Sequence, residues 1–233
     1  MTMNTERISQ IVLQIADSAF PIGGFAHSNG LESAMKWGVL KEDDQLPGFF
    51  RDCLVQVAGG CLPLVRAAHR GGSFQELDLL CDSFLNNHVA NRASCRQGQA
   101  LLNSARAIFP FPELDRLGQQ IRSHHLPGHF APVFGCFTCI VKLGEVDSLR
   151  LFLFMTLRSL VSSAVRLGLV GPLRGQSFQY ELGPFVEDII GAMFTCTDGA
   201  QDDSVEDLIV QTAPLIDLLQ ATHDRVYSRL FQS

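Results

Sequence analysis

The stretch that decides the fold is Ile8 to Glu32, ISQIVLQIADSAFPIGGFAHSNGLE, which predicts two helical segments joined by an apolar break. Apolar residues of the first segment recur at offsets of three, four, seven and eleven, the spacing of one helix face: Ile8, Ile11, Val12, Ile15 and Ala19. The break is Phe20-Pro-Ile-Gly-Gly-Phe25, and a second helical face then continues to Gly38. An apolar Pro/Gly-Gly break needs a cover, so we expect residues 20–30, here called the elbow, to pack against or dock onto something.

Helical spacing continues outward from this stretch, and no run alternates with the period of two that a strand needs. The capping pair Ser73 and Glu76 marks one helix start, and Pro214 suits the first turn of another. The sequence therefore predicts one all-α domain over residues 1–233, a bundle of roughly eight to ten helices. The expected helices beyond the elbow are Leu46–His69, a long helix from Ser73 to about Ile108, Asp115–His124, Ala131–Leu143, Ser148–Leu169, one near Phe185–Phe194, and a last one from Pro214 to about Leu230.

The composition favours a protein that works with partners. Hydrophobic residues make up 46% of the chain and charged residues 18%, which predicts an apolar surface. The net charge of −6 argues against nucleic acid, because such proteins usually present a basic patch. Seven scattered cysteines and a polar start without a signal peptide indicate a reducing, cytoplasmic setting. Arg158 and Arg166 interrupt the apolar run Leu149–Val170, so we predict a core helix there and no membrane span.

Ser28 raises the possibility of an enzyme. Ala26-His-Ser-Asn-Gly30 approximates the nucleophile motif of serine hydrolases, but that motif needs a strand that leads into a sharp turn. A helix and the elbow precede Ser28, so a cap or lining role near a helix start is the favoured interpretation. A helical hydrolase stays open as an alternative.

Cys136-Phe-Thr-Cys139 has the spacing of metal ligands, and His124, His125 and His129 lie just upstream. A structural zinc site needs four ligands and usually a second cysteine pair, which the chain lacks. We therefore predict no metal site and no cofactor, and interpret the two cysteines as small apolar groups on a buried helix face. A direct metallochaperone with these ligands is the second open alternative.

Two further polar features need partners. Arg158, Ser162 and Arg166 fall in one sector of an apolar helix, so they either bind within the chain or form a polar strip at a subunit seam. The last residues gather Tyr227, Arg229, Leu230 and Phe231, side chains that are common in interface hot spots. The alternative for this tail is that it folds back onto its own core.

Four ordered motifs resemble the urease accessory protein F family, whose members help to insert nickel into urease. They are Leu13-Gln-x-Ala-Asp-Ser-x-Phe-Pro-Ile-Gly-Gly-Phe-x-His-Ser-x-Gly-Leu-Glu32, His129-x-x-x-Val133-Phe-Gly135, Ser163-Ala-Val-Arg-Leu167 and His223-x-x-x-Tyr227-Ser-Arg-Leu-Phe-x-Ser233. Together they span nearly the whole chain.

The resemblance implies an all-helical, non-catalytic, dimeric protein. It implies that the chain bridges the scaffold accessory protein D (or H) and the GTPase accessory protein G, and that this complex passes nickel through an internal tunnel to apo-urease. By motif, Phe25, His27 and Arg229 become candidates for partner contact. The complete set of predicted contact residues is Phe20, Phe25, His27, Glu32, Tyr227, Arg229, Leu230, Phe231 and Ser233.

Overall fold

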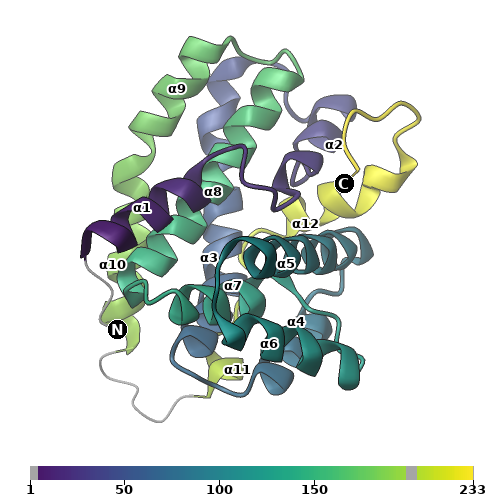
Figure 1. Cartoon of the computed structure of the whole chain (residues 1–233). Helices are drawn as coiled ribbons and strands as arrows, with labels where there is room; N and C mark the ends of the chain where they lie inside the picture. The colour runs from purple at the N-terminus through teal and green to yellow at the C-terminus, as the bar shows by residue number, and fades with distance from the viewer. Residues whose placement is uncertain (1–4, 198–203, 233) are drawn as a thin grey trace.

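A computed structural model describes residues 5–197 and 204–232, and every regular element within these ranges is a helix (Figure 1). The α-helices are α1 (Thr5–Ala16), α2 (Leu31–Lys36), α3 (Leu46–His69), α4 (Phe74–Phe84), α5 (His88–Ile108), α6 (Pro112–Ser123), α7 (Phe130–Ile140), α8 (Glu145–Arg166), α9 (Pro172–Glu181), α10 (Gly183–Thr197), α11 (Val205–Leu208) and α12 (Pro214–Ala221). Short 3-10 helices are η1 (Gly24–Ala26), η2 (Asp43–Gln45) and η3 (Thr222–Arg225). The predicted all-α class is confirmed, and ten of the α-helices described are eight residues or longer.

The core is built around α3, which makes its most extensive contacts with α7 and then with α8. In Figure 1, α3 and α8 run through the middle of the molecule, with α9 and α10 to one side and α4 to α6 to the other. Glycine permits the closest approach, because a Cβ on Gly135 of α7 would lie 2.3 Å from the carbonyl oxygen of Val65 on α3. Buried apolar side chains from α1 to α12 form one cluster. The single domain over residues 1–233 stays a prediction.

Two core helices have the length and composition of membrane spans. They are Asp43–His69 and Glu145–Arg166, with mean hydropathies of 1.2 and 1.3. The prediction that two arginines rule out a span by composition is therefore wrong for the second helix. Both are core helices all the same, since half or more of each apolar stretch is buried inside the molecule.

The predicted long helix from Ser73 to Ile108 is wrong, because the chain breaks between α4 and α5. Asn87 ends the run: its side-chain oxygen accepts hydrogen bonds from the backbone N–H groups of Val89 (3.0 Å) and Ala90 (3.4 Å). Its amide nitrogen donates to the carbonyl oxygen of Asp217 on α12 (2.9 Å). Asparagine is a strong N-cap, so this one residue starts a new helix and ties it to the far end of the chain.

The last helix is also shorter than expected. Helix α12 ends at Ala221, η3 follows, and residues 226–232, here called the tail, have no helix. The first helix similarly ends at Ala16 and not at Ala19, because the Asp17 carboxylate accepts a hydrogen bond from the backbone N–H of Ala19 (2.8 Å) and forms a turn. Helix α9, which starts at Pro172, was not expected from the sequence. At the end of α1 and at the break between α4 and α5, a side chain binds backbone that a longer helix would otherwise use, whereas the start of α9 has no side-chain cap.

Candidate functional site

The elbow leaves α1, turns twice and enters α2. Gly23 and Gly30 make the turns with positive φ angles of 75° and 84°, a region that favours glycine. A Cβ on Gly30 would also lie 3.3 Å from the backbone nitrogen of Gln220 on α12. The second glycine therefore lets the elbow pack directly onto the backbone of a helix near the C-terminal end of the chain.

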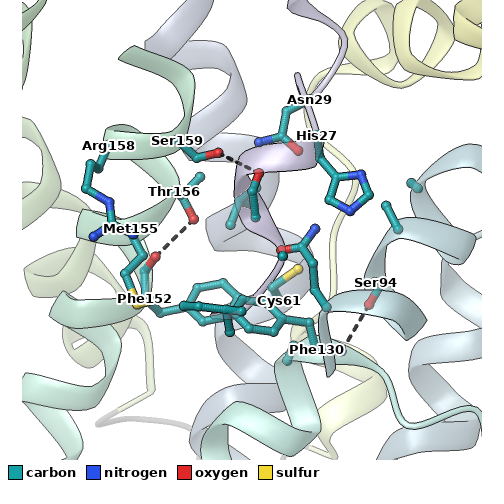
Figure 2. A pocket seen from close by; sticks show the side chains of 18 of the residues that line it. His27, Asn29, Cys61, Ser94, Phe130, Phe152, Met155, Thr156, Arg158 and Ser159 are labelled. Carbon is teal, nitrogen blue, oxygen red and sulfur yellow. Dashed lines mark hydrogen bonds between the residues drawn. The ribbon is translucent and has the colours of Figure 1, made fainter. Parts of the chain in front are cut away.

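The polar face of α8 holds the elbow by its carbonyl groups. Arg158 donates to the carbonyl oxygen of Ala16, and Ser159 donates to that of Gly24 (3.3 Å; Figure 2). Further along the helix, Ser163 donates to His27 and Arg166 donates to Phe25. Irregular backbone must find hydrogen-bond partners outside itself, and α8 supplies them. Two of the three polar residues predicted to need partners, Arg158 and Arg166, therefore bind within the chain. The serines that join them are Ser159 and Ser163 and not the predicted Ser162.

The tail binds the same elbow from outside. The carboxylate of Glu32 accepts hydrogen bonds from the backbone N–H groups of Leu230 (2.6 Å) and Phe231 (3.1 Å). Its second oxygen also lies 3.1 Å from Nε2 of His223, and both side chains are almost completely buried. The N–H of Gln232 donates to the carbonyl oxygen of Ala26 (2.8 Å). Elbow and tail, 200 residues apart in sequence, are therefore one structural unit.

A guanidinium group completes this unit. Arg166 lies 3.7 Å from the ring centroid of Phe25 and 4.3 Å from that of Phe231, so one cation contacts an aromatic ring of the elbow and one of the tail. Cation–π contacts of this kind contribute about 0.5–2 kcal/mol each, depending on exposure. The side chain of Arg166 thus joins α8, the elbow and the tail.

The predicted contact residues divide into two groups. Four of them are buried within the chain: Phe20, His27, Glu32 and Phe231. Four are exposed at the elbow and the tail: Phe25, Tyr227, Arg229 and Leu230. Ser233 lies outside the described residues. The exposed group, which we call the elbow–tail surface, includes a tyrosine with no measurable burial and a phenylalanine that is 65% exposed.

His27 lies beneath this surface. Burial lowers its pKa to about 4, and the neighbouring charges of Arg96, His223 and Arg92 act in the same direction. The imidazole is therefore neutral near pH 7. A neutral imidazole retains a lone pair, the form that binds metal ions.

Behind the elbow is a cavity of about 340 Å³ between α3, α5, α7, α8 and α12. In Figure 2, His27 and Arg158 lie on opposite sides of it, and the rings of Phe130 and Phe152 lie below them. Those rings stack with centroids 5.3 Å apart. Cys61 adds a sulfur atom to the lining. The lining of the cavity thus combines apolar side chains with many polar ones, mostly hydroxyl and amide groups.

Ser28 does not have the setting of a nucleophile. Its side chain is completely buried, and its hydroxyl has no hydrogen-bond partner. No strand precedes it in the part of the chain that the structure describes. Without a base or a projecting turn, the hydroxyl has nothing to activate it.

The metal-site alternative gains no support from the described residues, in which no three His, Cys, Asp or Glu side chains are arranged to hold an ion. Burial raises the pKa of Cys136 to about 12, so this thiol stays protonated. His129 binds elsewhere, as its ring nitrogens lie 3.1 Å from Asp82 and 3.1 Å from Ser94. Both cysteines lie on α7, but each is only half-buried, so the prediction that they occupy a buried helix face is wrong.

The motif at His129 has a structural role of its own. The buried carboxylate of Asp78 accepts hydrogen bonds from the backbone N–H groups of Gly128 (2.8 Å) and His129 (2.7 Å) at the start of α7. Burial raises the pKa of Asp78, against the effect of these two hydrogen bonds. Opposite them, a Cβ on Gly98 of α5 would lie 2.1 Å from the carbonyl oxygen of Gly128. This part of the motif fixes the α4–α5–α7 junction.

Sequence reasoning missed the part that α5 plays beside the tail. Arg92 donates to both carboxylate oxygens of Asp224 (2.9 and 3.1 Å), and Arg96 donates to the side-chain oxygen of Gln232 (3.2 Å). The spacing of the arginines places them on one helix face. Nothing in the sequence links that face to residues more than 130 positions away.

Comparison with known proteins gives consistent matches. A family model described as UreF matches residues 40–183. A rice protein (Oryza sativa subsp. japonica) named urease accessory protein F is 34% identical over 226 residues, covering 94% of this chain and 82% of the relative. The protein of the same name from Arabidopsis thaliana is 32% identical over 225 residues, covering 94% and 90%. Urease accessory protein UreF of Yersinia enterocolitica is 26% identical over 228 residues, covering 95% and 96%.

Proposed function

Because the chain belongs to the UreF family of urease accessory proteins, we propose that it is a scaffold that bridges the accessory protein D (or H) and the accessory GTPase G. It is a non-catalytic protein that takes part in urease maturation. In the proposed complex it is a cytoplasmic homodimer that helps to deliver nickel to apo-urease.

The observation that carries this proposal is the elbow–tail surface. Its exposed members Phe25, Tyr227 and Leu230 are large apolar or aromatic side chains. Glu32 accepts a hydrogen bond from the backbone of Leu230, and Arg166 lies against the ring of Phe25. Exposed aromatic and arginine side chains on a rigid support are the usual anchors of protein interfaces. A preorganised surface also loses less conformational entropy on binding than a free tail would.

The cavity behind the elbow is our candidate for a segment of the nickel route. His27 presents a neutral imidazole near it, and such a donor suits a borderline cation such as nickel. Burial raises the pKa of Cys61 to about 12, so its thiol stays protonated and is a poor ligand. The elbow lines one side of the cavity. A partner bound to the elbow–tail surface would therefore lie close to a nickel ion in the cavity.

A matched pair of substitutions tests the docking surface. The chain has two tyrosines, Tyr227 in the tail and Tyr180 on α9, and both are highly exposed. We expect Tyr227→Ala to weaken binding to the D/H protein or to the GTPase at least about tenfold, the effect of losing an interface anchor. We expect Tyr180→Ala to bind as the wild type does. Surface plasmon resonance gives the affinities, and nickel incorporation into apo-urease gives the functional readout.

Substitution of an exposed residue is cleaner than deletion of the last five residues. Deletion of residues 229–233 also removes the buried Phe231 ring and the N–H groups that occupy Glu32, so it would disturb the fold. Circular dichroism checks that both tyrosine variants are folded. Equal binding by both variants would contradict the docking surface, and a sedimentation measurement tests the homodimer separately.

A further inference from the structure

Basic side chains from three elements lie in or beside the elbow–tail surface. The set, which we call the basic rim, comprises His88, Arg92 and Arg96 of α5, Arg166 of α8 and Arg229 of the tail. The three α5 residues stand four apart, so they follow one helix face. In Figure 1, the C-terminal segment lies beside α2, and α12 also contacts α5.

The basic rim is tied together by one carboxylate. Asp224 lies 2.9 Å from a guanidinium nitrogen of Arg92, 2.9 Å from one of Arg229 and 3.3 Å from Nε2 of His88. The hydrogen bond from Arg92 is the largest of the effects that lower the pKa of Asp224, so this carboxylate is charged across the neutral range. A single aspartate therefore lies among three basic groups.

Among the described residues, Asp224 is the one carboxylate that forms an ion pair with the basic rim. Glu32 is buried and accepts hydrogen bonds from the tail backbone. Asp82 and Asp217 lie at the amino-terminal end of α5, where Asn91 and Asn87 respectively donate to them. The basic rim thus has an excess of positive charge on a chain whose net charge is −6.

Two of the arginines donate hydrogen bonds to neutral acceptors. Arg96 is exposed and donates to the amide oxygen of Gln232, and in residues 5–197 and 204–232 it forms no ion pair. Arg166 donates to the carbonyl oxygen of Phe25 and lies against two aromatic rings. Both guanidinium groups are positioned by the fold and still carry an unneutralised charge toward the elbow–tail surface.

We propose that the basic rim is a docking surface for an acidic segment of a partner protein, with Arg96 as the central recognition residue. The inference rests on the proposed function and adds the chemistry of the partner to it. The basic rim carries an excess of fixed positive charge beside exposed apolar side chains. A complementary partner segment would therefore alternate Asp or Glu side chains with apolar ones. Such complementarity raises association rates and selects among partners.

Substitutions at Arg96 test the proposal, with full-length protein and the cognate D/H protein and GTPase as ligands. We expect Arg96→Glu to weaken binding to one of them about tenfold or more, chiefly through slower association, because like charges then meet. Arg96→Lys keeps the charge and should bind nearly as the wild type does. Arg116→Glu on α6, an exposed arginine far from the tail in sequence, is the control and should leave the affinity unchanged.

The salt dependence of binding and the variant Gln232→Ala distinguish an effect of the Arg96 charge from an effect of the tail structure. Wild-type affinity should fall as NaCl rises from about 0.1 to about 1 M, over which the Debye length shrinks from about 10 to about 3 Å. Gln232→Ala removes the contact of Arg96 with the tail but not the charge, so binding should persist. If instead Gln232→Ala weakens binding as much as Arg96→Glu does, the loss of affinity comes from displacement of the tail and not from the charge of Arg96, and the proposal fails.

Two outcomes distinguish this inference from the function it rests on. If the wild-type chain binds a partner but Arg96→Glu binds equally well, or the affinity ignores salt, the acidic-partner proposal is wrong and the scaffold function stands. If the wild-type chain binds neither partner at any salt concentration, the scaffold function itself is wrong.

Discussion

The core of α3, α7 and α8 and the unit formed by elbow and tail are held together by different kinds of interaction. The core relies on apolar contact: Phe134 and Phe137 are completely buried, and Gly135 lets two helix backbones meet. The elbow and the tail rely on single polar side chains that bind backbone, above all Glu32 and Arg166. The core is therefore stabilised by many small contributions, whereas one substitution can release the elbow or the tail.

This difference has a functional meaning. A dense core tolerates little change and moves little, so it suits a scaffold. An irregular segment held by a few hydrogen bonds has a lower local stability, and such segments are commonly the ones that rearrange on binding. The elbow–tail surface is thus ordered in the free protein but has a lower local stability than the core that supports it.

The largest expected effect is on the core. Gly135→Ala would place a Cβ 2.3 Å from the Val65 carbonyl oxygen, and the two helices would have to separate. We expect a loss of about 3 kcal/mol in the free energy of unfolding, as for strong overpacking. Gly191→Ala on α10, where a Cβ meets no atom within 4 Å, is the matched control and should be neutral or slightly stabilising. Urea unfolding measures both, and equal stabilities would show that the core is looser than the contact implies.

The second effect concerns the pH dependence of the elbow. The pKa of His27 is lowered to about 4, so below its ordinary value the unfolded state binds a proton that the folded state does not. Stability from this residue is complete above about pH 6.5 and falls as the pH drops toward 4, by roughly 2.5 kcal/mol at pH 4.5. His27→Gln should flatten this part of the pH profile. Thermal unfolding of both proteins between these pH values measures how stability depends on pH. If the two pH dependences have the same slope, burial in the elbow does not disfavour protonation of His27.

The third effect is the smallest and tests the tail alone. Glu32→Gln replaces a carboxylate that accepts two backbone N–H groups by an amide that can accept only through one oxygen. We expect a loss of about 2 kcal/mol, confined to the tail. Hydrogen exchange should speed up at Leu230 and Phe231 and stay unchanged in α3 and α8. A loss of protection in those core helices as well would show that the two regions are not separable.

Periodicity predicted the helices whose faces are plainly apolar. The bounds of α3, Leu46–His69, agree with the expectation to the residue, because a buried stripe and a Gly71-Gly72 end both lie in the sequence. It failed where one polar side chain bound distant backbone. The cap at Asn87 divides the predicted long helix into α4 and α5. Glu32 binds the backbone of Leu230, so the end of the predicted last helix is a non-helical tail.

The candidate site was predictable only in part. Sequence motifs pointed to both the elbow and the tail, including Phe25, Tyr227 and Arg229. The motifs did not predict which of their residues are exposed. His27 and Glu32 belong to the same motif as Phe25, yet both are buried. Arg92 and Arg96 were not among the predicted contact residues, because an arginine on a helix face is ordinary until its neighbours are known.

By itself the sequence determined the all-α class, the core faces and the family, because these depend on local spacing and on motifs that survive in linear order. Only the tertiary structure decided that elbow and tail form one unit, that Glu32 and Arg166 hold it, and that basic side chains gather around it. Those facts depend on hydrogen bonds and contacts between residues up to about 200 positions apart, whose geometry no local pattern encodes.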